Sequence, residues 1–425
     1  MSWSFRASRR HGWRAGAALT ALWTIGAGTA RAAPQDPGTP AAPGPAPQPT
    51  PEEMKEIEKA LGADAKMQAP PPAEAPPARA AATVSLNPNI SFIGDFALAI
   101  FSQDDNLQAG GHDPTQNGFN LQALEMSVNS DVDPYFKFDA NIVIGPDGLE
   151  LEEAYATTLS LPASLQVRAG QFLTRFGRIN AMHPHRWDFV DQPLVIGKML
   201  GGDGNRNLGA EVSWLSPLPW FLELSVSETM ATGESTARSF YADDDQGVHD
   251  IRDLETVAAL KQFHDLSADW SLATGLSAAI GPNPSSPAAE SYVLGADVYL
   301  KYRPISRASP TIVSLQAEAL TRRRDTQAGK LADSGLYAQI LWKFAERWAT
   351  AARYDFVTGV QNDALDPEWT SERHRATADL TFFPTEFSRL RLQGSADVPT
   401  FLPKPIYAAF LAIEVAVGAH GAHAF

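Results

Sequence analysis

Residues 290–303 have the sequence ESYVLGADVYLKYR, in which every second side chain from Tyr292 to Tyr302 is apolar or aromatic. Asp297 and Lys301 lie in the opposite phase. Successive side chains of a β-strand point to opposite faces of the sheet, so this segment would present one face to lipid and the other to water. About ten residues of such alternation are typical of a strand that crosses an outer membrane.

The same alternation recurs from Asn89 to the end of the chain, and Gly, Pro, Asn or Asp closes each segment. Short connections such as 131–134 and 384–385 alternate with mostly longer ones such as 173–205, as expected for a barrel with short periplasmic turns and long outer loops. The sequence therefore predicts an all-β, transmembrane antiparallel β-barrel of about 16 strands. The candidate strands are 89–101, 119–130, 135–144, 150–160, 165–172, 206–215, 220–228, 255–264, 269–280, 290–303, 311–322, 334–344, 347–358, 371–383, 386–396 and 406–418.

Aromatic residues gather beside the short connections and predict a girdle at one membrane interface. A soluble β-sandwich or β-helix is the alternative, but neither needs an aromatic belt together with alternating loop lengths. The girdle residues are Tyr135, Trp214, Trp220, Trp270, Tyr302, Trp342, Phe344, Trp348, Phe382, Phe383 and Phe387.

The first 32 residues have the pattern of a secretory signal peptide. A basic start is followed by an apolar stretch at 15–27 and by Ala30-Arg31-Ala32, which fits an A-x-A cleavage site. A helix that crosses a bilayer needs about twenty apolar residues, more than this stretch offers. We therefore expect residues 1–32 to be removed on export from a Gram-negative cytoplasm.

Residues 33–86 are rich in Pro and Ala and predict an extended periplasmic linker. Within it, Thr50 and Pro51 begin a pattern typical of a short capped helix near 51–62. The barrel domain is then expected over residues 87–425.

Composition excludes several classes of function. The chain has no cysteine, so it has no disulfide and no thiolate metal site. Its formal charge is −15, and it becomes −20 without residues 1–32, which contain five basic and no acidic residues. Such a chain does not bind nucleic acid as a whole.

No motif predicts catalysis or a cofactor, because G-x-S-x-G, H-E-x-x-H and the phosphate-binding loop are all absent from the sequence. His183 and His185 flank Pro184, and His420 and His423 lie near the end of the chain. A metal site needs fixed geometry and usually a third ligand, which the sequence does not supply beside either pair. We therefore predict no enzyme, no cofactor and no metal site.

The strand phase predicts which charged residues face the lumen. Arg375, Arg389 and Arg391 fall on neighbouring strands and would form a positive stripe able to hold anions. Alternatively, such charges only solvate a watery wall or pair across strands. The predicted lumen-facing residues are Glu125, Lys137, Asp139, Arg168, Asp297, Lys301, Glu318, Lys343, Arg353, Asp355, Arg375, Asp379, Arg389, Arg391 and Glu414.

The connection 173–205 combines charged with apolar residues. A loop in solvent would not need Phe176, Trp187, Phe189, Val190, Leu194, Val195 and Ile196. We expect it to pack into the barrel as a constriction, and the alternative is a cap or a subunit clasp on the outer face. Its charged and imidazole residues are Arg175, Arg178, His183, His185, Arg186, Asp188, Asp191, Lys198 and Asp203.

Four motifs carry a resemblance to a known family: LELEEAY at 149–155, LQVRAGQF at 165–172, FGR at 176–178 and FVDQPL at 189–194. Over residues 149–205 the chain resembles the phosphate-selective porin O and P family. The resemblance implies a sixteen-stranded, trimeric barrel that passes small anions, with Arg168, Arg175 and Arg178 as pore residues. Glu153 falls in the outward phase of its strand, which indicates either a bulge or a subunit contact.

The sequence thus predicts an outer-membrane porin for passive diffusion of small hydrophilic solutes, including anions such as phosphate. Expected partners are outer-membrane lipid and lipopolysaccharide, small ions or solutes, and two further copies in a homotrimer. The barrel-insertion machinery is a further expected partner, because the terminal aromatic residue Phe425 resembles the assembly signal that it recognises. The alternative is a structural barrel tethered to the cell wall through its N-terminal segment. The predicted pore-lining or constriction residues are Arg168, Arg175, Arg178, Arg186, Asp188, Asp191, Lys198, Arg353, Arg375, Arg389 and Arg391.

Overall fold

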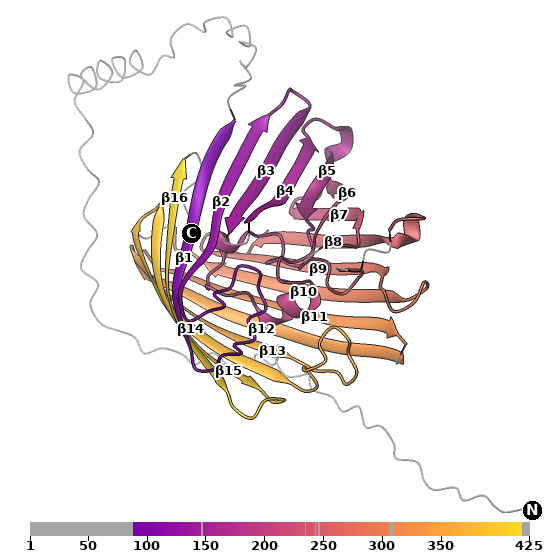
Figure 1. Ribbon diagram of the computed structural model, residues 1–425. Helices are drawn as coiled ribbons and strands as arrows, with labels where there is room; N and C mark the ends of the chain where they lie inside the picture. Colours follow the sequence, from indigo (N-terminus) through magenta and orange to yellow (C-terminus); the bar gives the residue numbers. More distant parts are fainter. Residues whose placement is uncertain are drawn as a thin grey trace, which may run out of the picture. The chain divides into compact units, whose positions relative to one another are not determined.

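The expected signal peptide (1–32), linker (33–86) and helix near 51–62 lie outside the residues that the structure describes, as do His420, His423 and Phe425. The computed structural model describes residues 88–145, 148–233, 235–242, 244, 247–305, 310–327 and 329–418 (Figure 1).

Period-two alternation produces sixteen strands in these residues, and they close into a barrel. Each strand pairs antiparallel with the next along the chain, and β16 pairs with β1 from Ser91 opposite Gly418 to Phe101 opposite Ala408. The strands are β1 Asn89–Phe101, β2 Gly118–Asp131, β3 Phe136–Gly145, β4 Gly148–Thr158, β5 Leu165–Leu173, β6 Arg206–Leu215, β7 Phe221–Met230, β8 Leu254–Asp265, β9 Trp270–Pro282, β10 Glu290–Tyr302, β11 Ile312–Thr326, β12 Gly329–Ala345, β13 Trp348–Val357, β14 Arg373–Thr385, β15 Ser388–Pro399 and β16 Ile406–Gly418. The expected antiparallel barrel is confirmed.

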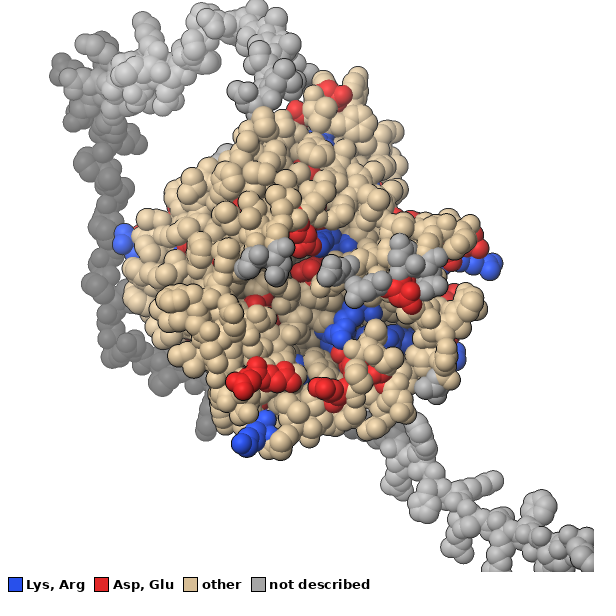
Figure 2. All heavy atoms as spheres, in the orientation of Figure 1, with Lys and Arg blue, Asp and Glu red and all other residues tan. Residues whose placement is uncertain are grey.

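The barrel wall is apolar outside and polar inside. On β16, Tyr407, Leu411 and Val415 are exposed, whereas Glu414 in the opposite phase is buried. Leu294 of β10 is likewise 52% exposed. A continuous exposed apolar belt is unfavourable in water but favourable against lipid. In Figure 2 the outer wall carries few charges, and acidic and basic side chains gather in and around the mouth of the barrel.

Aromatic side chains do line the short turns. The rings of Trp270 and Tyr302 lie 4.9 Å apart between centroids, and those of Trp348 and Phe382 lie 4.7 Å apart. Phe383 is an exception to the predicted girdle because it is only 9% exposed. Adjacent residues of a strand point to opposite faces, so with Phe382 outside, Phe383 faces the interior.

A β-bulge interrupts β4. Asn141 pairs with Glu153 and the next residue, Ile142, pairs with Leu151, so Glu152 is an extra residue on this strand. The bulge brings both Glu152 and Glu153 to the interior, where both are buried. Of the two alternatives for Glu153, the structure therefore shows the bulge.

Helical structure in the described residues is confined to short pieces. They are η1 (Pro162–Ser164), η2 (Pro184–Arg186), α2 (Leu194–Met199) and η3 (Ile251–Asp253). Among these residues, no helix has the length and apolar character that would let it cross a membrane.

Candidate functional site

The connection between β5 and β6, residues 174–205, lies inside the barrel. It contains η2 and α2, and all ten residues from Asp191 to Leu200 are buried. Its apolar side chains pack against inward-facing residues of the wall such as Leu320 and Tyr337. This internal loop therefore occupies the lumen, as its apolar residues predicted, and is not an outer cap. We call residues 174–205 the internal loop.

Small residues of the wall make room for the internal loop. A Cβ atom added to Gly295 of β10 would lie 2.9 Å from the buried ring of Phe176. A Cβ atom added to Gly335 of β12 would lie 2.8 Å from the Val195 side chain. Larger residues at these two positions would displace the loop.

The FGR motif at 176–178 is docked by one wall carboxylate. Glu318 of β11 accepts hydrogen bonds from the backbone N–H of Arg178 (2.9 Å) and of Ile179 (2.8 Å). Gly177 has φ 59°, and a Cβ atom there would lie 2.3 Å from the Glu318 carboxylate. The glycine is needed both for its left-handed backbone and for this close approach.

Guanidinium groups of β15 hold the next part of the loop by its backbone. Arg389 donates to the carbonyl oxygens of His185 (2.5 Å) and Trp187 (3.1 Å). Arg391 donates to the same Trp187 oxygen at 3.1 Å. Both guanidinium groups are buried by the loop that they hold. A buried carbonyl needs such a donor.

Asp191 is the centre of the strongest contact between loop and wall. Its carboxylate lies 3.0 Å from Arg353 Nη2, 2.9 Å from Arg375 Nη1 and 2.7 Å from Gln393 Nε2. Arg353 and Arg375 also donate to the carbonyl oxygens of Asp191 and Gln192. Burial alone would raise the pKa of Asp191, but the charges of Arg375 and Arg353 hold it below its ordinary value.

The end of α2 is fixed by a second buried network. Lys198 Nζ lies 3.2 Å from Asp333 Oδ2 and donates to the carbonyl oxygen of Thr358 at 2.5 Å. Arg322 of β11 donates to the same Asp333 at 2.6 Å and 2.9 Å and to the Lys198 carbonyl at 3.3 Å. Lys198 therefore compensates the charge of Asp333 on the wall and does not face open water.

The structure favours pairing over solvation for the predicted positive stripe. Arg389 forms an ion pair with Glu414, and Arg391 lies 3.5 Å from Asp379. With Arg375 bound to Asp191, each of these three guanidinium groups has an acidic partner and lies under the internal loop.

Two other predicted arginines, one on β5 and one in the internal loop, pair with acidic residues of the wall. Arg168 lies 3.0 Å from Glu211 and stacks 4.1 Å from the Phe172 ring centroid. Arg175 lies 2.9 Å from Glu211 and also pairs with Glu223. Arg168 is nearly buried, whereas Arg175 remains partly exposed.

Arg178 and Lys301 form a partly exposed basic pair near the short-turn end of β10. The guanidinium carbon of Arg178 lies 3.8 Å from the Tyr299 ring centroid, and its Nε donates to Gln316 at 3.0 Å. Tyr299 and Lys301 are both in the inward phase of β10. Among the ion pairs of the described residues, neither Arg178 nor Lys301 has an acidic partner.

The two remaining predicted loop residues differ in their surroundings. Asp188 accepts a hydrogen bond of 2.7 Å from Gln339 Nε2 on β12. Arg186, in η2, is exposed, and no ion pair of the described residues includes it. The structure therefore does not bring Arg186 into the group of residues that fasten the loop.

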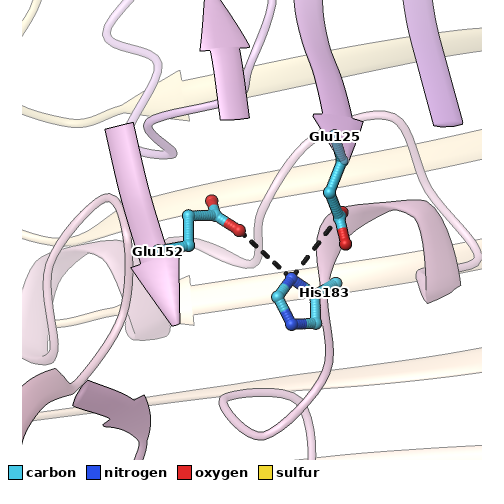
Figure 3. Close-up of side chains that lie close together, drawn as sticks. All are labelled: Glu125, Glu152 and His183. Carbon is cyan, nitrogen blue, oxygen red and sulfur yellow. Dashed lines mark hydrogen bonds and ion pairs between the residues drawn. The ribbon is translucent and has the colours of Figure 1, made fainter. Parts of the chain in front are cut away.

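A cluster of glutamates and histidines joins the loop to β2 and β4. His183 Nε2 lies 2.8 Å from Glu153 Oε2, and its Nδ1 lies 3.2 Å from Glu152 and 3.7 Å from Glu125. His185 Nδ1 lies 2.9 Å from the same Glu125 oxygen. Figure 3 shows Glu125 and Glu152 pointing from their strands toward one edge of the His183 ring.

A third histidine extends this cluster from the connection between β1 and β2. His112 Nε2 lies 2.8 Å from Glu152 Oε1. Burial would lower the pKa of His112, but the hydrogen bond and charge of Glu152 raise it to about 9. Burial likewise opposes the charged form of His183, yet the charge of Glu125 and the hydrogen bonds to Glu152 and Glu153 hold its pKa well above the ordinary value.

Residues 102–117, the connection between β1 and β2, also fold into the barrel, although no sequence pattern predicts it. Arg373 of β14 donates to the carbonyl of Leu107 at 2.7 Å and pairs with Asp397 at 2.6 Å. Asp113 accepts a hydrogen bond of 2.8 Å from the backbone N–H of Gln192 in the internal loop. No local sequence pattern marks these partners, which are separated by 79 to 266 residues.

Two hollows flank the internal loop on the side of β1, β2 and β4. One, of about 30 Å³, is lined by Glu152, Ile179, His183 and Arg206 among others. The other, also of about 30 Å³, is lined by Asp95, Phe189, Arg389 and Glu414 among others. His112 and Pro184 line both hollows, so these two residues separate one hollow from the other.

Solved structures with the same architecture are outer-membrane proteins. An anion-selective porin from Comamonas acidovorans is 11% identical, with a TM-score of 0.51 over 78% of this chain and 99% of that one. The outer-membrane channel DcaP of Acinetobacter baumannii is 13% identical, with a TM-score of 0.51 over 78% and 96%. OprB of Pseudomonas putida is 10% identical, with a TM-score of 0.51 over 78% and 94%. The fold is therefore that of an outer-membrane porin barrel.

No family model matches the sequence. A curated protein of Aquifex aeolicus (strain VF5), described as an uncharacterized protein, is 32% identical over 384 residues and covers 80% of each sequence. With this identity over four-fifths of both proteins, the chain belongs to the same protein family as this Aquifex aeolicus protein.

Proposed function

We propose that the protein is a passive outer-membrane channel for small hydrophilic solutes, with a preference for small anions such as phosphate. The observation that carries the proposal is the internal loop, which is fixed across the lumen of a closed, apolar-walled barrel by Arg353, Arg375, Arg389 and Arg391. A loop held in this way narrows the lumen without blocking it. Passive diffusion through such a pore needs neither a cofactor nor an energy source.

The size limit follows from how closely the internal loop fills the lumen. The hollows beside it have volumes of only about 30 Å³ each, and both are lined by charged and polar side chains as well as apolar ones. Such a narrow lumen favours small ions and excludes oligosaccharides and peptides. We expect solutes to pass along the side of the lumen formed by β1, β2, β4 and β16.

The preference for anions rests on the charges that remain accessible. The inward carboxylates of Asp297, Glu318 and Glu211 are each occupied by a cation or by loop amides. Arg178 and Lys301, in contrast, are partly exposed. Among the described residues, Asp188 is the acidic group whose charge acts on both of them, but it forms no ion pair with either, so this carboxylate only partly offsets the two positive charges. Accessible positive charge in a narrow section favours anions. The local resemblance of residues 149–205 to phosphate-selective porins favours phosphate among them.

We further propose that three copies assemble side by side. An outer-membrane protein of Vibrio cholerae that shares this fold, with 8% identity and a TM-score of 0.50, is described in a trimer form. Crosslinking of the protein in native outer membranes, followed by size separation, should give a trimer that dissociates only on heating.

Planar-bilayer conductance tests the channel itself. The purified protein should give stable conductance steps, a reversal potential under a salt gradient that indicates anion preference, and block by phosphate. Cation-selective steps would retain the channel and contradict the anion preference. No conductance from a correctly folded barrel would contradict the channel and favour the structural alternative.

A further inference from the structure

Three carboxylates and two imidazoles meet where the internal loop contacts β2 and β4. Glu125, Glu152 and Glu153 come from the wall, and His183 and His185 come from the loop. All three carboxylates are buried. Buried carboxylates this close together need compensating positive charge.

The hydrogen bonds of His183 fix which of its nitrogens carries a proton. Its Nε2 lies 2.8 Å from the Glu153 carboxylate and 3.0 Å from the Asn141 side-chain amide, which also donates to Glu153. Because the carboxylate only accepts hydrogen bonds and is the nearer partner, we assign the hydrogen to Nε2. Its Nδ1 lone pair then faces Glu152 and Glu125. A lone pair and two carboxylate oxygens repel one another unless a cation lies between them. That cation is either a second proton on Nδ1 or a metal ion.

A metal ion would be bound by Glu125, Glu152 and His183 at once, which a proton cannot be. A proton on Nδ1 can be donated to Glu152 at 3.2 Å, whereas Glu125 at 3.7 Å is beyond hydrogen-bond range of Nδ1 and has His185 Nδ1 as its partner at 2.9 Å. One donor atom from each of Glu125, Glu152 and His183 lies within 4.8 Å of the others. Ligand atoms that each bond one ion at about 2.1 Å lie about 3 to 4.2 Å apart. The two distances from His183 Nδ1, 3.2 Å and 3.7 Å, fall in that range, and rotation of the glutamate side chains would bring the two carboxylates into it.

The surroundings also resemble those of metal ligands. A ligating histidine usually donates its other ring N–H to a carboxylate, as His183 does to Glu153. His185 contacts Glu125, and His112 contacts Glu152, so both carboxylates are held in place from outside. The hollow of about 30 Å³ beside Glu152 and His183 has room for about two waters at the remaining coordination positions.

We propose that Glu125, Glu152 and His183 bind one divalent transition-metal ion, such as Zn²⁺, which fastens the internal loop to β2 and β4. One imidazole and two carboxylates suit Zn²⁺, Mn²⁺ or Fe²⁺, whereas Ca²⁺ prefers a cage of oxygens only. The bulge at Glu152 is essential, because in a regular strand only one of Glu152 and Glu153 would face the interior. This inference does not depend on whether the barrel conducts.

Metal binding to the purified barrel, without an affinity tag and after removal of metal with a chelator, tests the proposal. Dialysis against Zn²⁺ with elemental analysis should show one ion per chain more for the wild type than for Glu152→Gln. Ca²⁺ at the same concentration should not compete. Glu153→Gln keeps all three ligands but replaces the charged acceptor of His183 by a neutral amide, and it should bind Zn²⁺ about 10-fold more weakly.

Two matched controls separate this site from surface binding. Glu150→Gln changes an exposed carboxylate on the same strand, and His249→Gln changes an exposed histidine of an outer loop. Both should bind Zn²⁺ like the wild type. Equal binding by the wild type and by folded Glu152→Gln would overturn the proposal. So would the absence of binding by the wild type, because a proton would then hold the cluster.

A measurement on the wild type alone covers the case in which Glu152→Gln does not fold. The denaturant midpoint of the wild-type barrel should be higher in Zn²⁺ than in chelator, because an ion that binds only the folded state stabilises it. Co²⁺ in place of Zn²⁺ should give a visible absorption band that excess Zn²⁺ removes. An unchanged midpoint together with no such band would refute the metal site.

Discussion

Asp191 of the internal loop lies between two guanidinium groups of the wall, 3.0 Å from Arg353 and 2.9 Å from Arg375. The two arginines belong to neighbouring strands, β13 and β14, and all three side chains are almost fully buried. This contact fixes the loop at the point where α2 begins. Asp355 pairs with the same two arginines, so two carboxylates balance two guanidinium groups. The contribution of this network is therefore to hold the loop and not to attract solutes.

Replacing Asp191 by Asn should release the internal loop. Removal of the Asp191 charge leaves Asp355 as the shared partner of two buried guanidinium groups, 2.8 Å from Arg353 and 3.6 Å from Arg375. One buried positive charge then lacks compensation, which costs about 3 to 5 kcal/mol in the free energy of unfolding. Single-channel conductance should rise because the constriction widens. Arg323→Met, which changes an exposed arginine of β11, is the control and should leave both quantities unchanged. A D191N barrel with wild-type conductance would show that the loop stays in place without this contact.

Gly335→Val tests the same loop by steric means. The added side chain would meet Val195 of α2 at 2.8 Å and the carbonyl of Phe356 at the same distance. We expect a folded barrel with larger conductance and faster proteolysis of the internal loop, at a cost of about 1 to 3 kcal/mol. Gly394→Val points outward, with the nearest atom 3.9 Å away, and should behave like the wild type. Equal protease resistance of the two variants would contradict the expected displacement.

Lys301→Gln tests the origin of ion selectivity. This lysine and Arg178 are the accessible positive charges that we assign to the narrow section. Loss of one charge should lower the anion-to-cation permeability ratio roughly twofold, as determined from the reversal potential. Lys330→Gln serves as the control, because its side chain is 86% exposed and belongs to the outer end of β12. If both variants shift the ratio equally, the selectivity arises at the mouth instead.

Asp113 should make barrel stability depend on pH. Burial and the charge of nearby Asp191 raise its pKa from 3.8 to about 6. The folded state therefore binds this proton more tightly than the unfolded chain, so the contribution of Asp113 is most favourable below pH 3.8 and is lost as pH rises through 6. Asp113→Asn should reduce the difference in unfolding free energy between pH 4 and pH 7 by about 2 to 3 kcal/mol.

Denaturant titrations at both pH values measure this effect. Asp104→Asn, an exposed carboxylate of the same connection, should show the wild-type difference. A difference that persists in full in D113N would assign the pH dependence to other groups.

Much of the barrel could be predicted from the sequence, because lipid outside and polar groups inside enforce a strict period of two. The largest errors are at the outer ends of β11 and β12, where 311–322 and 334–344 were expected and the strands extend to Thr326 and from Gly329. Arg322 and Asp333 face inward and pair with each other at 2.6 Å, which lets both strands continue.

The candidate site could be predicted only in part. Strand phase correctly assigned Arg375 and Arg389 to the interior, but their burial depends on loop carbonyls about 183 and 204 residues away. The two histidines of the loop suggested no metal site because their carboxylate partners come from β2 and from a bulge in β4. A bulge breaks the period on which the phase prediction relies.

The internal loop contacts wall segments that precede it as well as segments that follow it. His183 meets Glu152 of β4, whereas Arg389, which is 204 residues beyond His185, belongs to β15. Contacts over such separations form late, because the entropy lost on closing a long segment of chain is paid before they can stabilise anything. The contacts between the internal loop and β15 therefore cannot form until β15 has been translocated. Barrel closure and constriction of the lumen are consequently one folding event, and a chain truncated before β15 would acquire neither.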